Sequence, residues 1–188
     1  MAQNRNSLRS INMIKASFLE ILKTKDISKI SVKEITEKAN LTRNTFYNHF
    51  IDVYSVNEAL EDDLIDKTLE FIDDYFSSDI ITNSYSFFES VLNYINSDKE
   101  MLLALLNHGT SNFINKFSHR ILEHVFNNLK NIKFVDKEGF KIFLEILLTG
   151  ATYIIRQYLV GEINLSLKEI TNILNNIFLN SYKSYIKE

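Results

Sequence analysis

Apolar residues recur every three or four positions through most of the chain, which is the spacing of amphipathic helices. Near the N-terminus Ile11, Ile14 and Phe18 follow this spacing and predict a first helix over about 7–24, with Ser7 as its candidate N-cap. The spacing also predicts five later helices, at about 84–96, 98–107, 110–130, 137–160 and 166–187. The pattern therefore predicts an all-α protein of about nine helices.

Capping residues support several of these boundaries. Two serine–glutamate pairs have the spacing of a capping box, namely Ser97 with Glu100 and Ser166 with Glu169. Gly109 and Gly161 fall where helices are expected to end, because glycine readily adopts the left-handed conformation of a helix C-terminus.

Two short helices follow the first one. Ser31 begins a capping box with Glu34 and predicts a second helix to about residue 39. Asn40 is one of the few residues other than glycine that tolerate a left-handed turn, and Thr42 can cap a third helix over about 43–50. Two short helices joined by a tight turn form a helix-turn-helix.

A long fourth helix is predicted after Asp52, its candidate N-cap. The stretch from Glu61 to Asp79 has eight acidic residues and one lysine, Lys67. Such a run is usually a solvated helix face, which is the interpretation adopted for it.

The last two predicted helices are apolar on more than one face. Phe143, Leu147, Ile154 and Tyr158 lie along one side of the helix at 137–160, with Ile142, Ile146 and Tyr153 on another. A helix that is apolar around so much of its girth must be covered from two directions. We therefore expect a homodimer through the helices at 137–160 and 166–187, with a central position in a monomeric bundle as the alternative.

The charge is unevenly distributed along the chain. The 188 residues have a net charge of −3, but residues 1–58 carry nine basic and six acidic side chains, and residues 59–188 carry twelve and eighteen. Residues 1–58, the N-terminal head, therefore have a net charge of +3, and residues 59–188 have a net charge of −6. This distribution suits a protein that contacts phosphate groups through one end only.

Composition excludes several classes of protein. The chain has no cysteine, which removes disulfide frameworks, thiolate zinc sites and thiol catalysis. It has no apolar run of membrane-spanning length and no apolar stretch typical of a signal peptide, so a cytoplasmic protein without a membrane partner is expected. With no phosphate-binding glycine loop and no nucleophile motif, we expect neither an enzyme nor a cofactor.

His119, Glu123 and His124 are close enough in the sequence to be candidate metal ligands. His119 and Glu123 share a helix face, but His124 is offset from Glu123 by about 100°. Exposed polar residues are therefore the preferred interpretation, and no metal is expected.

The stretch SVKEITEKANLTRNTFYNHF, residues 31–50, resembles the DNA-binding head of the TetR family of transcriptional regulators, with Thr45, Phe46, Tyr47, His49 and Phe50 as its most specific residues. The stretch FLEILLTGATYIIRQYLVGEINLSLKEI is similar to the group of dihydroxyacetone-kinase activators. The resemblance implies a helix-turn-helix DNA-binding domain at 1–58 and a helical effector-binding and dimerisation domain at 59–188.

The third helix is short enough to lie in a major groove with its first residues at the base edges. Arg43, Asn44, Thr45 and Asn48 are the candidates for reading bases there. The resemblance implies phosphate contacts from Tyr47 and His49, although His49 could serve mainly in packing. Ser31 and Thr42 are further candidates for phosphate contacts.

The chain departs from the family at the start of the fourth helix. The family usually has a lysine where this sequence has Val53. Tyr54 is a possible substitute as a phosphate contact.

The resemblance also implies a small-molecule effector among the middle helices. Aromatic and polar candidates for its pocket are Phe88, Tyr94, His108, Phe113, Phe117, Tyr153 and Arg156. Most such residues could instead be core, and Arg156 could bind an anionic ligand or form a salt bridge across the dimer.

The expected function is a dimeric repressor of operator DNA whose affinity a ligand alters. The alternative is a helical protein-interaction module or an activator that depends on a protein coactivator. The operator and the effector are not encoded in any recognisable motif.

Overall fold

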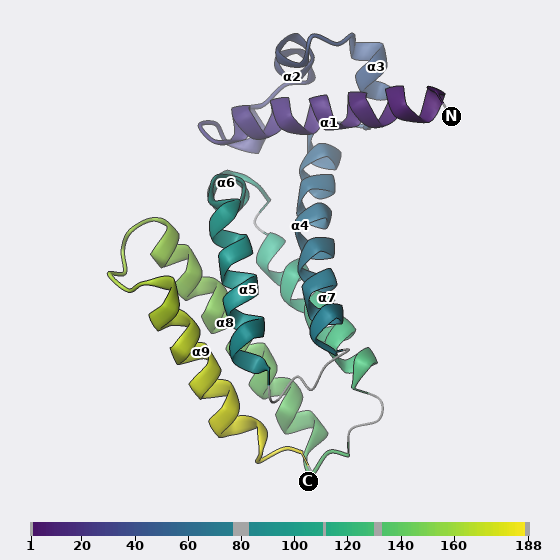
Figure 1. Cartoon of the computed structure of the whole chain (residues 1–188). Helices are drawn as coiled ribbons and strands as arrows, with labels where there is room; N and C mark the ends of the chain where they lie inside the picture. Colours follow the sequence, from purple (N-terminus) through teal and green to yellow (C-terminus); the bar gives the residue numbers. More distant parts are fainter. Residues whose placement is uncertain (1, 77–82, 111, 130–132, 187–188) are drawn as a thin grey trace. The chain divides into compact units, whose positions relative to one another are not determined.

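The computed structural model describes residues 2–76, 83–110, 112–129 and 133–186, and all nine α-helices in this part of the chain appear in Figure 1. They are α1 (Ala2–Leu22), α2 (Val32–Ala39), α3 (Arg43–Tyr47), α4 (Val53–Phe76), α5 (Ser84–Ser97), α6 (Lys99–His108), α7 (Phe113–Asn128), α8 (Lys137–Leu159) and α9 (Leu167–Tyr182), with a 3₁₀ turn η1 (Ile27–Lys29) after α1. The predicted all-α class is confirmed. No helix in the described ranges is both long and apolar enough to cross a membrane.

The chain forms two compact units. Unit 1 comprises Met1–Leu64 and Glu100–Phe113, and unit 2 comprises Ile65–Lys99 and Ile114–Glu188. Residues of α6 thus belong to the same unit as the N-terminal helices. The functional division expected between residues 58 and 59 remains a prediction.

The core of unit 1 forms where α1 packs against α2 and α3. Ile14, Phe18 and Leu22 lie on one face of α1 and are completely buried, as are Ile35 of α2 and Phe46 of α3. This is the apolar stripe that the sequence spacing predicted. Each buried side chain of this size contributes roughly 1.5–3 kcal/mol relative to exposure.

An ion pair fastens α1 to α4 in the same unit. Lys15 Nζ is 2.7 Å from the Asp63 carboxylate and donates a second hydrogen bond of 3.2 Å to the Ala59 carbonyl. The Lys15 side chain is only 16% exposed, so water screens this pair less than it screens a typical surface pair.

Helix α6 is held against the N-terminal segment near both of its ends. Lys23 Nζ is 2.6 Å from the Glu100 carboxylate at the start of α6, and His108 Nδ1 at its last residue is 3.1 Å from the Asp26 carboxylate. The hydrogen bond with His108 lowers the pKa of Asp26. These two contacts join α6 to the N-terminal segment within unit 1, alongside the buried side chains of Met101, Leu102 and Leu105.

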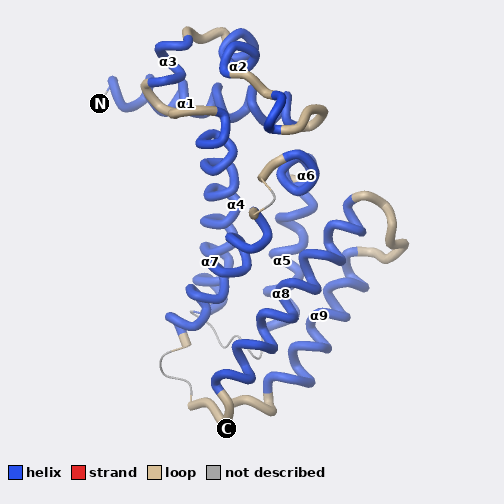
Figure 2. The backbone as a smooth tube through the Cα atoms, turned by 180° about the vertical axis from the view of Figure 1, so that it is seen from behind, coloured by secondary structure: helices blue, strands red, loops and turns tan. Residues whose placement is uncertain are grey.

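Unit 2 is a helical layer with an aromatic cluster at one end. Helix α9 packs against α5 and α8, and Figure 2 shows α8 and α9 side by side. Phe143 stacks on Tyr185 with ring centroids 5.6 Å apart, and Phe178 stacks on Tyr182 at 5.5 Å. This cluster closes the core between α8 and α9.

Most predicted helix boundaries agree with the structure within a few residues, but Ser7 does not cap α1. The helix already begins at Ala2, and Ser7 lies inside it. Residues 2–6 include neither glycine nor proline, so nothing in this segment stops the helix. At the other end of the chain, α9 stops at Tyr182, and residue 187 of the predicted helix lies outside the described residues, as do residues 111 and 130 of the helix predicted at 110–130.

The predicted capping box of Ser97 with Glu100 is wrong. Ser97 is the last residue of α5, where its hydroxyl donates to the Tyr94 carbonyl, and Glu100 instead pairs with Lys23. The second predicted box is confirmed, since the Ser166 hydroxyl accepts from the Glu169 amide and the Glu169 carboxylate accepts from the Ser166 amide. Gly161, with φ +80°, ends α8 as expected.

The acidic run on α4 is solvated only in part. Asp63, Asp66 and Asp73 are exposed, as predicted, but Glu61 is buried. It accepts hydrogen bonds of 2.6 Å from both Asn57 and Thr110, which replace water at its carboxylate. Residues 77–79 of the predicted run lie outside the described residues.

Candidate nucleic-acid interface and ligand region

The capping box at Ser31 fixes the start of α2. The Glu34 amide donates to the Ser31 hydroxyl at 3.3 Å, and the Ser31 amide donates to the Glu34 carboxylate at 2.9 Å. Lys25 also contacts this carboxylate at 2.6 Å. The Lys25 ammonium, together with the Ser31 hydroxyl and amide, lowers the pKa of Glu34 to about 2. The Ser31 side chain is exposed and remains reachable by a phosphate.

The turn between α2 and α3 has the predicted geometry. Asn40 adopts φ 53° and ψ 46°, the left-handed conformation that ends α2. Thr42 then caps α3 by accepting a 3.1 Å hydrogen bond from the Thr45 amide. The two short helices and this turn form the expected helix-turn-helix. Helix α3 is shorter than predicted, because it ends at Tyr47 and residues 48–50 do not continue it.

Burial of two phenylalanines sets the orientation of α3. Phe46 is completely buried and Phe50 nearly so, and their ring centroids are 5.9 Å apart. Anchoring this side in the core turns the opposite side of α3 to solvent. The polar residues Arg43, Asn44 and Asn48 are exposed, together with Tyr47, which is 58% exposed.

Thr45 and His49 are half-buried and are therefore less accessible than the other candidates. The hydroxyl of Thr45 lies 2.9 Å from that of Thr42. Both interpretations of His49, as a phosphate contact and as a packing residue, are compatible with this burial.

The first residues of α4 include position 53, where the family usually has a lysine and this chain has Val53. The Asp52 carboxylate accepts a 2.8 Å hydrogen bond from the Ser55 amide, which confirms Asp52 as the N-cap. Val53 is buried, whereas Tyr54 is exposed. The first turn of α4 therefore presents Tyr54, and not residue 53, at the surface.

Ile51 was not among the predicted site residues. It is 85% exposed and lies between α3 and α4. An isoleucine immediately before a capping aspartate falls outside the helical apolar spacing, and this was the signal available in the sequence.

The seven predicted effector residues are divided between the two units. His108 and Phe113 belong to unit 1, and the other five belong to unit 2. Two of these five make aromatic contacts: Phe88 with Phe178 at 6.0 Å, and Tyr94 with Phe71 at 5.3 Å. Phe117 and Arg156 are half-buried, and Tyr153 is exposed. Their role in ligand binding remains a prediction.

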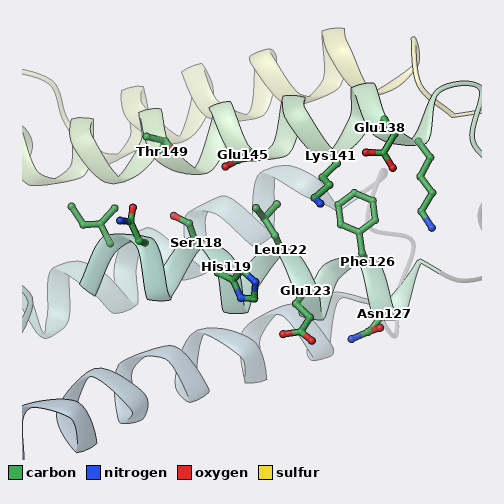
Figure 3. A pocket seen from close by; sticks show the side chains of 13 residues that line it. Ser118, His119, Leu122, Glu123, Phe126, Asn127, Glu138, Lys141, Glu145 and Thr149 are labelled. Carbon is green, nitrogen blue, oxygen red and sulfur yellow. The ribbon is translucent and has the colours of Figure 1, made fainter. Parts of the chain in front are cut away.

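A groove between α7 and α8 was not predicted. Its volume is about 740 Å³, and Figure 3 shows Ser118, Leu122 and Phe126 of α7 pointing toward α8, with Lys141 of α8 pointing toward α7. The sequence contained no direct signal for it, because a mixed polar and apolar helix face looks like an ordinary exposed one.

The histidines considered for a metal site are separated by their contacts. His119 and Glu123 line the α7–α8 groove, whereas His124 Nε2 is 2.6 Å from the Asp73 carboxylate on α4. Within the ranges that the structure describes, no three His, Cys, Asp or Glu side chains are arranged to hold a metal ion.

An apolar surface runs along α8 and α9. It includes the exposed side chains of Ile142, Ile146 and Tyr153 on α8 and of Ile173 and Ile177 on α9. A groove of about 240 Å³ lies between the two helices, lined by Ile146, Ile173, Ile177 and their neighbours. These residues include the second apolar face of the helix predicted at 137–160.

Comparison with known proteins agrees with this geometry. Residues 82–180, more than half of the chain, match the TetR family model described as the transcriptional regulator C-terminal region. The chain is also 34% identical over 64 residues to the uncharacterized HTH-type transcriptional regulator YxbF of Bacillus subtilis (strain 168). This match covers 34% of the chain and 17% of the length of that relative.

Solved structures share the fold at low sequence identity. A TetR transcriptional regulator from Streptococcus agalactiae 2603V has a TM-score of 0.69 and 19% identity, covering 94% of this chain and 97% of that one. The dihydroxyacetone kinase operon activator DhaS has a TM-score of 0.63 and 16% identity, covering 95% and 98%. At these identities the likeness concerns the fold, and the narrower resemblance to kinase activators remains a prediction. The family match and the helix-turn-helix agree, and this chain belongs to the TetR family of transcriptional regulators.

Proposed function

We propose that the protein is a dimeric repressor that binds a specific operator through residues 1–58 and changes its operator affinity when a small molecule binds within residues 59–188. The observation that carries the DNA-binding part is the burial of Phe46 and Phe50. The burial of these two rings turns Arg43, Asn44 and Asn48 to solvent. Arg43 and Asn44 begin α3 directly after its N-cap Thr42, and Asn48 follows the last residue of the helix.

The exposed side chains of α3 suit the edges of bases. An arginine can donate two hydrogen bonds to a guanine, and an asparagine can pair with an adenine, each discriminating by about 1–3 kcal/mol. Arg43 and Asn44 lie at the N-terminal end of α3, the end that a recognition helix brings to the bases. Tyr47, Tyr54, Ser31 and Thr42 are proposed to contact phosphates, which fixes the register on the duplex.

The apolar surface on α8 and α9 supports a homodimer. Exposed isoleucines on two adjacent helices are costly in water and are a suitable centre for an interface. Gly150 lies in this surface, and a Cβ atom placed there would meet no other atom within 4 Å. A glycine in a helix interior is less stable than alanine, and here it allows a partner helix to approach closely.

An operator selection tests the proposal. Duplex fragments selected from random DNA by the purified protein should contain an inverted repeat, with half-sites about 10 base pairs apart or an extended multiple of this arrangement. Scrambling one half-site should reduce binding strongly, because a single head of charge +3 offers few phosphate contacts. Full binding to an isolated half-site would contradict the dimeric mechanism, and an absence of salt-sensitive DNA binding would favour a protein-interaction module.

A further inference from the structure

Ser118 presents an unusual hydroxyl in the α7–α8 groove. The residue is only 9% exposed, yet its Oγ has no hydrogen-bond partner among the described residues. A buried polar group without a partner is unfavourable and is rare in folded proteins. Because Ser118 points from α7 toward α8 (Figure 3), this buried, unpartnered hydroxyl lies directly beside the groove between the two helices.

Charged side chains of α8 line the same groove in a defined order. Lys137 and Lys141 lie one turn apart, followed one turn later by Glu145. None of these three side chains has an ion pair within the described part of the chain. A lysine that precedes a glutamate by four positions is the less favourable order for pairing within a helix. Lys141 and Glu145, whose Cβ atoms are about 6 Å apart at this spacing, therefore offer opposite charges to a ligand in the groove.

The remaining lining determines what kind of ligand fits. Leu122 and Phe126 of α7 form an apolar wall, while Glu123, His119 and Glu138 add polar groups at the edge. Two lysines disfavour a simple cation, and three glutamates disfavour a simple anion. A small molecule that carries both charges matches the groove better than either.

We propose that the α7–α8 groove binds a small zwitterion of the amino-acid type with an apolar side chain. Its carboxylate contacts Lys137 and Lys141, its ammonium group contacts Glu145, and Ser118, which lies beside Glu145 on the side away from Lys141 (Figure 3), donates or accepts a further hydrogen bond at that end of the groove. The apolar side chain packs on Leu122 and Phe126. A volume of about 740 Å³ is within the usual range for ligand pockets.

This inference deepens the ligand response proposed above and rests on that proposal for its consequence at the operator. The groove itself is tested without DNA, by titration calorimetry of the full-length protein. The probes are L-leucine and L-phenylalanine, each compared with the analogue that lacks the ammonium group (4-methylpentanoate or 3-phenylpropanoate) and the analogue that lacks the carboxylate (3-methylbutylamine or 2-phenylethylamine). At least one amino acid should bind about tenfold or more tightly than both of its analogues. Equal binding of an analogue, or no binding of either amino acid, would overturn the proposal.

Three variants locate the bound molecule. Lys141→Gln should abolish the preference for the amino acid over the amine, and Glu145→Gln should abolish its preference over the carboxylic acid. Ser118→Ala should weaken binding about tenfold while raising the melting temperature of the free protein, because it removes the buried unpartnered hydroxyl. Lys168→Gln on α9 is the matched control, since Lys168 does not line the groove, and should bind like the unmodified protein.

Binding by all three groove variants at unmodified affinity would place the ligand elsewhere and contradict the assignment. A failure of the operator proposal is distinguishable from this result. In that case the protein would still bind the amino acid in the absence of DNA, but it would not select an inverted repeat.

Discussion

The Thr110 hydroxyl donates a 2.6 Å hydrogen bond to the buried carboxylate of Glu61, linking the segment after α6 to α4 within unit 1. Asn57 donates to the same carboxylate oxygen at 2.6 Å. Glu61 is only 3% exposed, so these donors take the place of water. The two contacts make the end of α6 part of the packing of α4.

Replacing Thr110 with valine should therefore destabilise unit 1. The variant keeps the shape of the side chain but removes a donor from a buried carboxylate, which costs about 1–3 kcal/mol. Urea unfolding followed by circular dichroism measures this loss. Thr110→Ser retains the hydroxyl and should lose much less free energy of unfolding than Thr110→Val. Equal stability of the two variants would contradict a role for the hydrogen bond.

Arg43→Ala and Tyr47→Phe should affect DNA binding in different ways. Arg43→Ala should cost about 1–3 kcal/mol on the selected operator and relax the preference at particular bases. Tyr47→Phe should weaken binding to all duplexes alike, because phosphate contacts carry little sequence information. Competition binding against single-base variants of the operator distinguishes these effects, and unchanged affinity in both variants would refute the proposed docking of α3.

Ile146→Glu should dissociate the proposed dimer. An unpaired carboxylate buried at the centre of an apolar interface costs about 3 kcal/mol or more, which corresponds to more than a hundredfold in the dissociation constant. Sedimentation at micromolar concentration measures the association. Val135→Glu, at an exposed valine outside α8 and α9, is the control and should sediment like the unmodified protein. A monomer before any substitution would exclude this interface.

Acid should weaken the N-terminal head through Glu34. The pKa of its carboxylate falls from an ordinary value of 4.5 to about 2, mainly because of the hydrogen bond with Lys25. A carboxyl with a lowered pKa stabilises the folded state fully above its unfolded pKa, and this contribution is lost as the pH falls from about 4.5 to about 2. The urea concentration at the midpoint of unfolding, measured over this pH range, should decline less steeply with falling pH in Glu34→Gln than in the unmodified protein. Glutamine can still form the capping box, so the variant removes the titrating group and keeps the cap. An unchanged slope would show that Glu34 does not contribute to the acid sensitivity.

The elements built from local interactions could be predicted from the sequence. The turn at Asn40 and the cap at Thr42 depend on residues within a few positions, so their chemistry is visible in the order of the amino acids. The apolar spacing likewise identified Ile14 and Phe18 on the face of α1 that the structure buries. Ser97 has the local spacing of an N-cap for the helix that follows it. Helix α5 extends to Ser97, however, so this residue ends α5 and does not cap α6.

Features that depend on tertiary neighbours could not be predicted. Glu61 is one of a run of acids, and its hydrogen bond from Thr110, 49 positions later in the chain, is a contact that the local sequence does not reveal. The α7–α8 groove likewise depends on how closely two helices approach, which the spacing of Ser118 and Lys141 in the sequence does not encode.

The discontinuity of unit 1 has a consequence for synthesis on the ribosome. Residues 100–113 complete this unit, and Met101, Leu102 and Leu105 of α6 are buried. The nascent chain must therefore extend through residue 113, and close the intervening segment 65–99 into a loop, before unit 1 can acquire its full set of contacts. A chain released after residue 64 would carry every residue of the helix-turn-helix and still lack the residues of α6 that complete unit 1.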